Sequence, residues 1–130
     1  MTSYIVDTHA LIWYLVDDPR LGEKAREILQ SSGNRLIVPA IVLAQARHIA
    51  DAKRVPISFQ DVLTAITRDP SCVVAPVDTL TVSYMPKGLD IHDGLIVATA
   101  LLYRDLLGED VYILTRDERI RESHFAPIAW

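Results

Sequence analysis

Short, mainly apolar runs alternate along the chain with longer segments whose apolar residues recur at helical spacing. The runs predict short buried strands at residues 4–6, 35–38, 73–75 and 111–114, with a possible fifth strand near Ile128. Helices are predicted from Thr8, from Leu21, over residues 40–53, after Ser58, and over residues 78–83, 91–106 and 117–122. Because strands alternate with helices throughout, the pattern predicts an α/β layer fold with a mainly parallel sheet.

Several predicted helices carry broad apolar faces. In the helix over residues 40–53, Ile41, Ala44 and His48 share one face. The ALIWYLV stretch after His9 and the FQDVLTAI stripe after Ser58 supply more apolar surface than one small core covers. We therefore expect the protein to form a homodimer.

Composition limits the class of protein. The chain has 130 residues, of which 50% are hydrophobic and 23% charged, so we expect one folded domain over residues 1–130. The formal net charge of −4 argues against a protein that coats nucleic acid non-specifically. Cys72 is the only cysteine, which excludes an internal disulfide. Since no secretory segment and no bilayer-spanning apolar stretch is visible, we expect a soluble, cytoplasmic protein with no membrane partner.

An aspartate marks the end or the start of three predicted elements. Asp7 follows the first strand, Asp93 opens the long apolar helix, and Asp117 follows the fourth strand. Acids at the carboxyl ends of parallel strands point into the crevice where open α/β sheets bind ligands. Two carboxylates about 4 Å apart repel by roughly 4 kcal/mol at an effective dielectric constant near 20, so a cluster of acids favours a bound cation. The pattern therefore predicts a divalent metal site that hydrolyses phosphate esters.

The same acids have a simpler interpretation as helix caps. Asp7 and Asp117 each precede a predicted helix, and Asp90 and Asp93 stand at the start of another, where acids complement the helix dipole. For Asp90, a supporting residue, the cap interpretation is favoured. Asp93 is favoured as a site residue because it lies next to Gly94, which permits close approach of a backbone or a ligand. The two interpretations are compatible, since a capping carboxylate keeps a lone pair for a metal.

Polar residues near these acids are candidate supporting groups. Thr8 is expected to help orient a water molecule of the metal shell, and Thr115 to turn its hydroxyl toward the crevice. Arg116 and Arg119 flank Asp117 and are the predicted contacts to substrate phosphates. The four histidines show no paired metal-ligand spacing, and no GxSxG, P-loop or GxGxxG motif occurs. Metal-assisted chemistry is therefore the class that the motifs favour.

Four stretches of the chain resemble the PIN-domain family, and the length resembles that of the VapC-type toxins of toxin–antitoxin pairs. These stretches are IVDTHALIWYL, IVPAIVLAQARHIADAKR, DIHDGLIVATALL and VYILTRDERI. The resemblance implies a three-layer α/β/α fold with a parallel sheet, an acidic cluster that binds Mg²⁺ or Mn²⁺, and endoribonuclease activity. It also implies a homodimer and a protein antitoxin that blocks the site.

Carried over by position, the family's acids fall on Asp7, Asp93 and Asp117, with Thr115 at a hydroxyl position near the site. A glutamate is usual on the helix after the second strand, and the matching position here holds Gln45. Glutamine keeps a carbonyl oxygen for a cation or a water, but it loses a charge and cannot act as a base. The chain is either a natural member with weakened metal affinity or one that carries an inactivating substitution. The rival function is a PIN-fold module that binds RNA or a protein partner without cleaving RNA.

Overall fold

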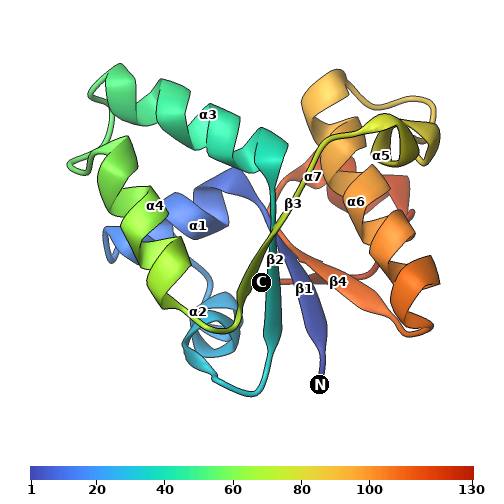
Figure 1. The fold of residues 1–130 in the computed structure, drawn as a ribbon, viewed down its shortest axis with the longest axis horizontal. Helices are drawn as coiled ribbons and strands as arrows, with labels where there is room; N and C mark the ends of the chain where they lie inside the picture. The colour runs from blue at the N-terminus through green and yellow to red at the C-terminus, as the bar shows by residue number, and fades with distance from the viewer.

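Five parallel strands form the central sheet, in the order β3-β2-β1-β4-β5 (Figure 1). The structure, a computed structural model, describes residues 1–130. The strands are β1 (Ser3–Val6), β2 (Arg35–Pro39), β3 (Cys72–Ala75), β4 (Val111–Leu114) and β5 (Ile128–Ala129). The predicted α/β class and the parallel sheet are thereby confirmed.

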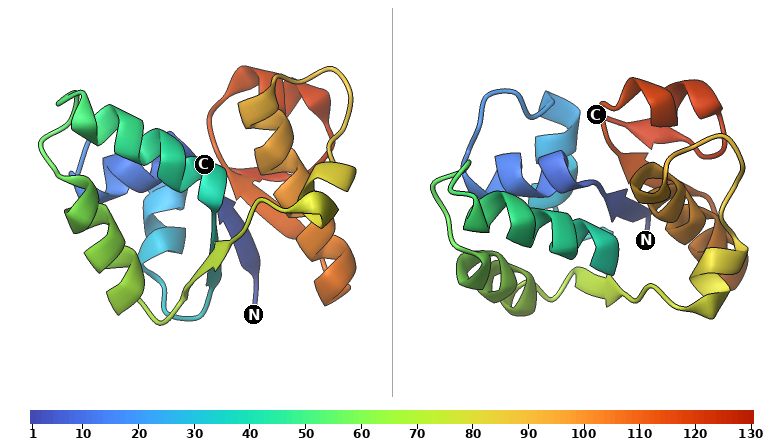
Figure 2. Two further views of the ribbon diagram at one scale, coloured as in Figure 1. Left: turned by 45° about the horizontal axis from the view of Figure 1, so that its top comes forward. Right: turned by 90° about the horizontal axis from the view of Figure 1, so that it is seen from above.

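Helices cover both faces of the sheet and complete a three-layer α/β/α arrangement. The helices are α1 (Thr8–Leu15), α2 (Glu23–Gln30), α3 (Ala40–Asp51), α4 (Phe59–Arg68), α5 (Thr79–Ser83), α6 (Ile91–Leu107) and α7 (Glu118–Ser123). Helices α1–α4 lie on one side of the sheet and α5–α7 on the other (Figures 1 and 2). This division follows from right-handed crossovers, because the chain moves outward from β1 to β3 and then returns past β1 to β4.

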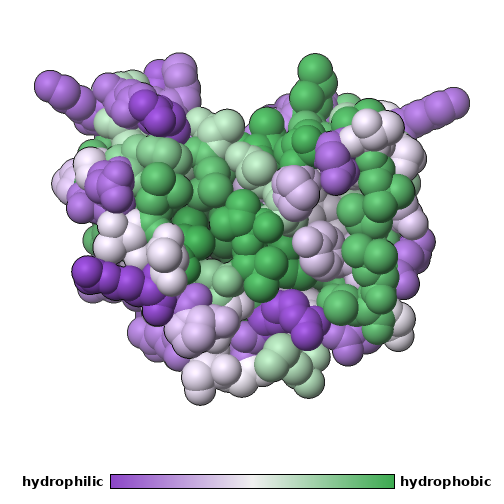
Figure 3. Space-filling model, viewed as in Figure 1, coloured by the Kyte–Doolittle hydropathy of each residue, from purple (hydrophilic) through white to green (hydrophobic).

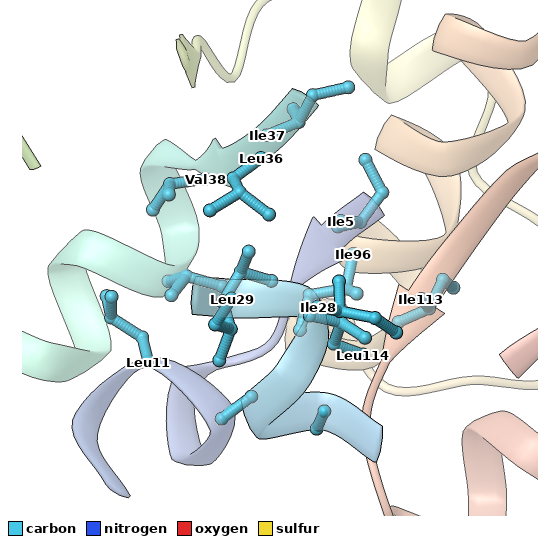
Figure 4. Close-up of a cluster of buried hydrophobic side chains, with 14 of the residues drawn as sticks. Ile5, Leu11, Ile28, Leu29, Leu36, Ile37, Val38, Ile96, Ile113 and Leu114 are labelled. Carbon is cyan, nitrogen blue, oxygen red and sulfur yellow. The ribbon is translucent and has the colours of Figure 1, made fainter. Parts of the chain in front are cut away.

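The central strands are buried on both faces, as their near-continuous apolar sequences predict. Ile5 of β1, Ile37 of β2 and Ile113 of β4 are fully buried. Leu29 of α2 and Ile96 of α6 belong to the same apolar cluster and come from opposite layers (Figure 4). Burying each such side chain stabilises the fold by about 1.5–3 kcal/mol, so this cluster fixes how the strand ends are aligned.

The buried face of α3 differs from the face that Ile41, Ala44 and His48 share. Val42, Ala46 and Ala50 are the buried residues of this helix, whereas Ala44 and His48 are exposed. The AIVLAQA stretch is apolar at nearly every position, so its periodicity does not single out one face. Small side chains at Ala46 and Ala50 permit close packing against the neighbouring helices α1 and α4.

The ALIWYLV and FQDVLTAI segments are only partly buried. Val62 and Ile66 are buried, whereas Tyr14, Leu15 and Ala65 are partly exposed and line an apolar groove. In addition, Val73 and Val74 of the edge strand β3 are 42% and 45% exposed, and Leu80 and Val82 of α5 are each 52% exposed. On the face of the molecule seen in Figure 3, apolar side chains gather over β3 in the middle of the view. None of the helices combines the length and the apolar character that crossing a membrane requires.

Candidate active site

The candidate site lies where the strand order reverses. The strands β1 and β4 are neighbours, and Val6 is paired with Leu114. The chain continues from these residues to Asp7 and Thr115, so both side chains emerge at the carboxyl edge of the sheet. The chain leaves β1 for β2 on one side of it, and later enters β4 on the other side. The connections that follow β1 and β4 therefore run to opposite faces of the sheet and leave a crevice between them. Open α/β sheets bind ligands in such crevices.

Asp7 is held by donors from both neighbouring strand ends. Its side chain is buried, with the residue 8% exposed. The backbone N–H of Thr8 donates to Asp7 Oδ1 at 2.7 Å, and Thr115 Oγ1 donates to Asp7 Oδ2 at 2.6 Å. The cap interpretation of Asp7 is thus confirmed. Each carboxylate oxygen keeps a further lone pair, so the capping bonds leave room for another ligand.

A single hydroxyl connects Asp7 with Asp117. Thr115 Oγ1, which donates to Asp7, also accepts from the backbone N–H of Asp117 at 3.0 Å. Asp117 in turn caps α7, because its Oδ1 accepts from the backbone N–H groups of Arg119 at 2.8 Å and Ile120 at 3.3 Å. Its Oδ2 makes no hydrogen bond within the protein. Thr115 therefore fixes two site carboxylates relative to each other.

Asp93 is the acid without a structural partner. The neighbouring Asp90 caps α6, accepting from the backbone N–H of Asp93 at 2.8 Å, as predicted. Asp93 is only 5% exposed, yet no hydrogen bond reaches its carboxylate. Burial raises the pKa of Asp93, and the charges of Asp117 and Asp90 raise it further. Beside Asp93, a Cβ added at Gly94 would lie 3.0 Å from the Cε atom at the flexible end of Met85.

Gln45 joins the site through Thr8. Thr8 Oγ1 donates to Gln45 Oε1 at 2.8 Å, so the hydroxyl expected to orient a water is used within the protein. His92 Nε2 lies 3.4 Å from Thr8 Oγ1 and 4.0 Å from Asp7 Oδ1. Nothing in the sequence singles out His92 apart from its place directly before Asp93.

The predicted acids line one polar cleft of about 260 Å³. No apolar residue lines it; its walls are Asp7, His9, Gln45, Asp90, His92, Asp93, Asp117 and Arg119. The side chains do not form a finished coordination shell, since no group of three or more His, Cys, Asp or Glu residues is arranged to hold a metal ion. The cleft nevertheless gathers carboxylate and amide oxygens, which are the donors that hard divalent cations prefer.

The two predicted phosphate-binding arginines lie on different sides of Asp117. Arg119 lines the acidic cleft, with its Nη1 atom 3.7 Å from Asp90 Oδ2. Arg116 lies outside the cleft, with its Cζ atom 4.6 Å from the centre of the Trp13 ring. Of the two, only Arg119 therefore lines the acidic cleft itself.

Replacing Asp93 with asparagine should stabilise the protein in the absence of metal. The raised pKa indicates that burial and repulsion outweigh the helix-dipole interaction, which is worth about 0.3–1 kcal/mol. We expect the melting temperature at pH 7.5 in EDTA to rise by about 3 °C, corresponding to roughly 1 kcal/mol. The difference should shrink as the pH falls through the raised folded-state pKa, because protonation then removes the same charge from the wild type.

Asp110→Asn is the matched control for this melting experiment. Asp110 is exposed and makes no hydrogen bond or ion pair, so its replacement should leave the melting temperature unchanged. An Asp93→Asn protein that melts at or below the wild-type temperature would show that the Asp93 charge does not destabilise the folded protein.

Comparisons with known proteins give matches over nearly the whole chain. The family model of the PIN domain matches residues 4–125. A crystal structure of VapBC2 from Rickettsia felis, bound to a DNA fragment from the promoter, contains a chain with a TM-score of 0.69 and 11% identity; the match covers 98% of each chain. The PIN domain of T. brucei RRP44 gives a TM-score of 0.63 and 9% identity, covering 98% of this chain and 75% of that one. None of the curated proteins compared with the sequence matches it. At these identities, the structural likeness concerns the fold alone.

Proposed function

Because this chain belongs to the PIN-domain family, we propose that it is a metal-dependent endoribonuclease that hydrolyses RNA phosphodiester bonds. The observation that carries the proposal is the carboxylate of Asp93, which belongs to a largely buried residue, accepts no hydrogen bond within the protein, and opens onto the cleft that it lines with Asp7 and Asp117. A charge kept in such a place destabilises the free protein, so a ligand that neutralises it explains its presence. A cytoplasmic location is part of the same proposal.

Asp7, Asp93 and Asp117 are the residues that would hold Mg²⁺ or Mn²⁺. Their carboxylates suit hard cations, and Mg²⁺ usually binds through one or two carboxylates together with water and substrate phosphates. Three converging protein ligands are therefore not needed. When bound, the cation supplies Lewis-acid activation of the attacking water and neutralises charge on the phosphate.

The remaining residues orient these groups and the substrate. Thr115 holds Asp7 and sets its position relative to Asp117, so the two carboxylates stay oriented before substrate arrives. Gln45, held by Thr8, offers an amide that can position a water but cannot take its proton. Arg119 would contact an RNA phosphate at the cleft, where its Nη1 atom lies 3.7 Å from Asp90 Oδ2.

Cleavage of a fluorogenic single-stranded RNA tests the proposal. We expect cleavage with Mg²⁺ or Mn²⁺ and none in EDTA. The rival function, a PIN-fold module that binds RNA or a protein partner, is favoured by one observation, the neutral Gln45 in place of an acid. That rival would leave the RNA intact under both conditions.

Protein partners form a further part of the proposal. By resemblance to VapC-type toxins, the protein would form a homodimer and bind a protein antitoxin. The exposed apolar side chains on β3 and α5 support a protein-binding surface, because contiguous exposed apolar patches mark interaction sites. Light scattering measures the dimer directly, as a molar mass twice that of one chain.

A further inference from the structure

A second cavity adjoins the acidic cleft. It has a volume of about 340 Å³, within the range of small-ligand pockets. Asp7, His9 and Asp117 line both spaces, so the cavity and the acidic cleft are continuous at these residues. Its other walls are Ala10, Trp13, Arg20, Thr115, Arg116 and Trp130. Cationic and aromatic side chains thus stand directly beside the cluster of carboxylates.

Arg116 is the cation in this cavity whose side chain donates no hydrogen bond within the protein. Its guanidinium lies over the Trp13 ring and makes no ion pair or hydrogen bond. Stacking occupies the face of the guanidinium plane and leaves the N–H donors at its edge free. Arg20 also lies over Trp13, at 4.5 Å, but Asp18 binds it through two hydrogen bonds of 2.8 Å and 3.1 Å. Arg116 therefore has all of its N–H donors available, whereas Asp18 already engages two of those of Arg20.

The aromatic wall of the cavity is fixed by its packing. Trp130 follows the edge strand β5 and meets Trp13 edge-on, with ring centroids 6.0 Å apart. Gly22 lies directly against Trp130, since a Cβ there would come within 2.6 Å of the indole Cδ1 atom. His9 is exposed, and its ring centroid lies 5.2 Å from that of Trp13. Aromatic surface is therefore in place before any ligand binds.

We propose that this cavity binds one nucleotide of single-stranded RNA, next to the phosphate held at the acidic cleft. Arg116 contacts the phosphate of that nucleotide, and the rings of Trp130 and His9 contact its base. Proteins recognise unpaired RNA by stacking splayed bases on aromatic side chains, together with cationic contacts to the backbone. The subsite also offsets the repulsion between an RNA strand and a cleft lined by four aspartates. It rests on the proposed function, because it assumes that RNA is the substrate.

The two tryptophans make occupancy directly measurable. Trp13 and Trp130 are the only tryptophans of the chain, and both line this cavity. A fluorescein-labelled, mixed-sequence RNA of ten nucleotides, titrated in EDTA to prevent cleavage, gives affinity by anisotropy. The unlabelled RNA should quench the intrinsic tryptophan fluorescence over the same concentration range.

Arg116→Gln is the test variant and Arg121→Gln is its matched control. Arg121 is exposed on α7 and lines neither space, and its replacement changes the net charge equally. We expect Arg116→Gln to weaken RNA binding about tenfold and to reduce the slope of log affinity against log salt by about 0.7. Arg121→Gln should change the affinity by less than about twofold. Circular dichroism establishes that both variants fold.

The outcomes separate the subsite from the proposed function. If the RNA does not quench tryptophan fluorescence, or if the two variants bind RNA equally well, the subsite is wrong. Cleavage of the same RNA by the wild type with Mn²⁺ would then leave the nuclease proposal intact. Absence of both binding and cleavage would end both proposals.

Discussion

Replacement of Asp7 by asparagine is expected to lower the rate of RNA cleavage by about 10²–10³-fold, the loss that follows removal of one preorganised electrostatic group from an active site. The asparagine side chain can still accept from the Thr8 N–H through its amide oxygen. Its amide nitrogen would face Thr115 Oγ1, which can accept that bond after its own proton turns away. The fold and the cap are therefore retained while the charge is lost.

The measurement compares initial rates of cleavage of a fluorogenic RNA in Mn²⁺. Asp110→Asn provides the control, because the substitution is chemically the same but lies at the amino end of β4, away from the cleft. It should cleave at the wild-type rate. If Asp7→Asn were as active as this control, the chemistry would have to occur somewhere other than the carboxyl edge of β1.

The second large effect is expected from replacing Gln45 with glutamate. The introduced carboxylate can keep the hydrogen bond from Thr8 Oγ1 while adding a negative charge to the cleft. One more charge a few ångströms from a bound cation contributes roughly 1–4 kcal/mol of attraction, depending on solvent screening. We expect the dissociation constant for Mn²⁺ to fall about tenfold, near the lower end of that range, and cleavage at limiting metal to rise accordingly.

Isothermal titration with Mn²⁺ measures this change, and Gln60→Glu controls for the added net charge. Gln60 is exposed on α4, on the surface of the helical layer, and lines none of the site. If Gln45→Glu raised the metal affinity and the cleavage rate no more than Gln60→Glu does, Gln45 would not lie next to the bound metal.

The candidate site was only partly predictable from the sequence. Asp7 and Asp117 stand out because each directly follows or closely follows a buried strand, and parallel strands end at a common edge. The connection through the Thr115 hydroxyl did not stand out, because it depends on the pairing of β1 with β4. The burial of Asp93 also comes from packing, since the start of a helix is exposed in most contexts.

The fold elements and the sheet type were determined by the sequence itself. Strands, helices and caps depend on neighbours within a few residues, so hydrophobic periodicity and residues such as Asp90 and Ser58 record them locally. The same local information failed for α3, whose apolar sequence allows several buried faces and whose actual one, at Val42 and Ala46, depends on adjacent helices.

Only the tertiary structure decided which side chains meet. Trp13, Arg116 and Trp130 come from the first helix, a connection after β4 and the end of β5, and they form one cavity because crossover handedness and strand register bring these segments together. Contacts between distant segments depend on the free energy of the whole packed core rather than on any local pattern. For that reason the sequence by itself indicated an acidic site, whereas the arrangement around it was decided by the fold.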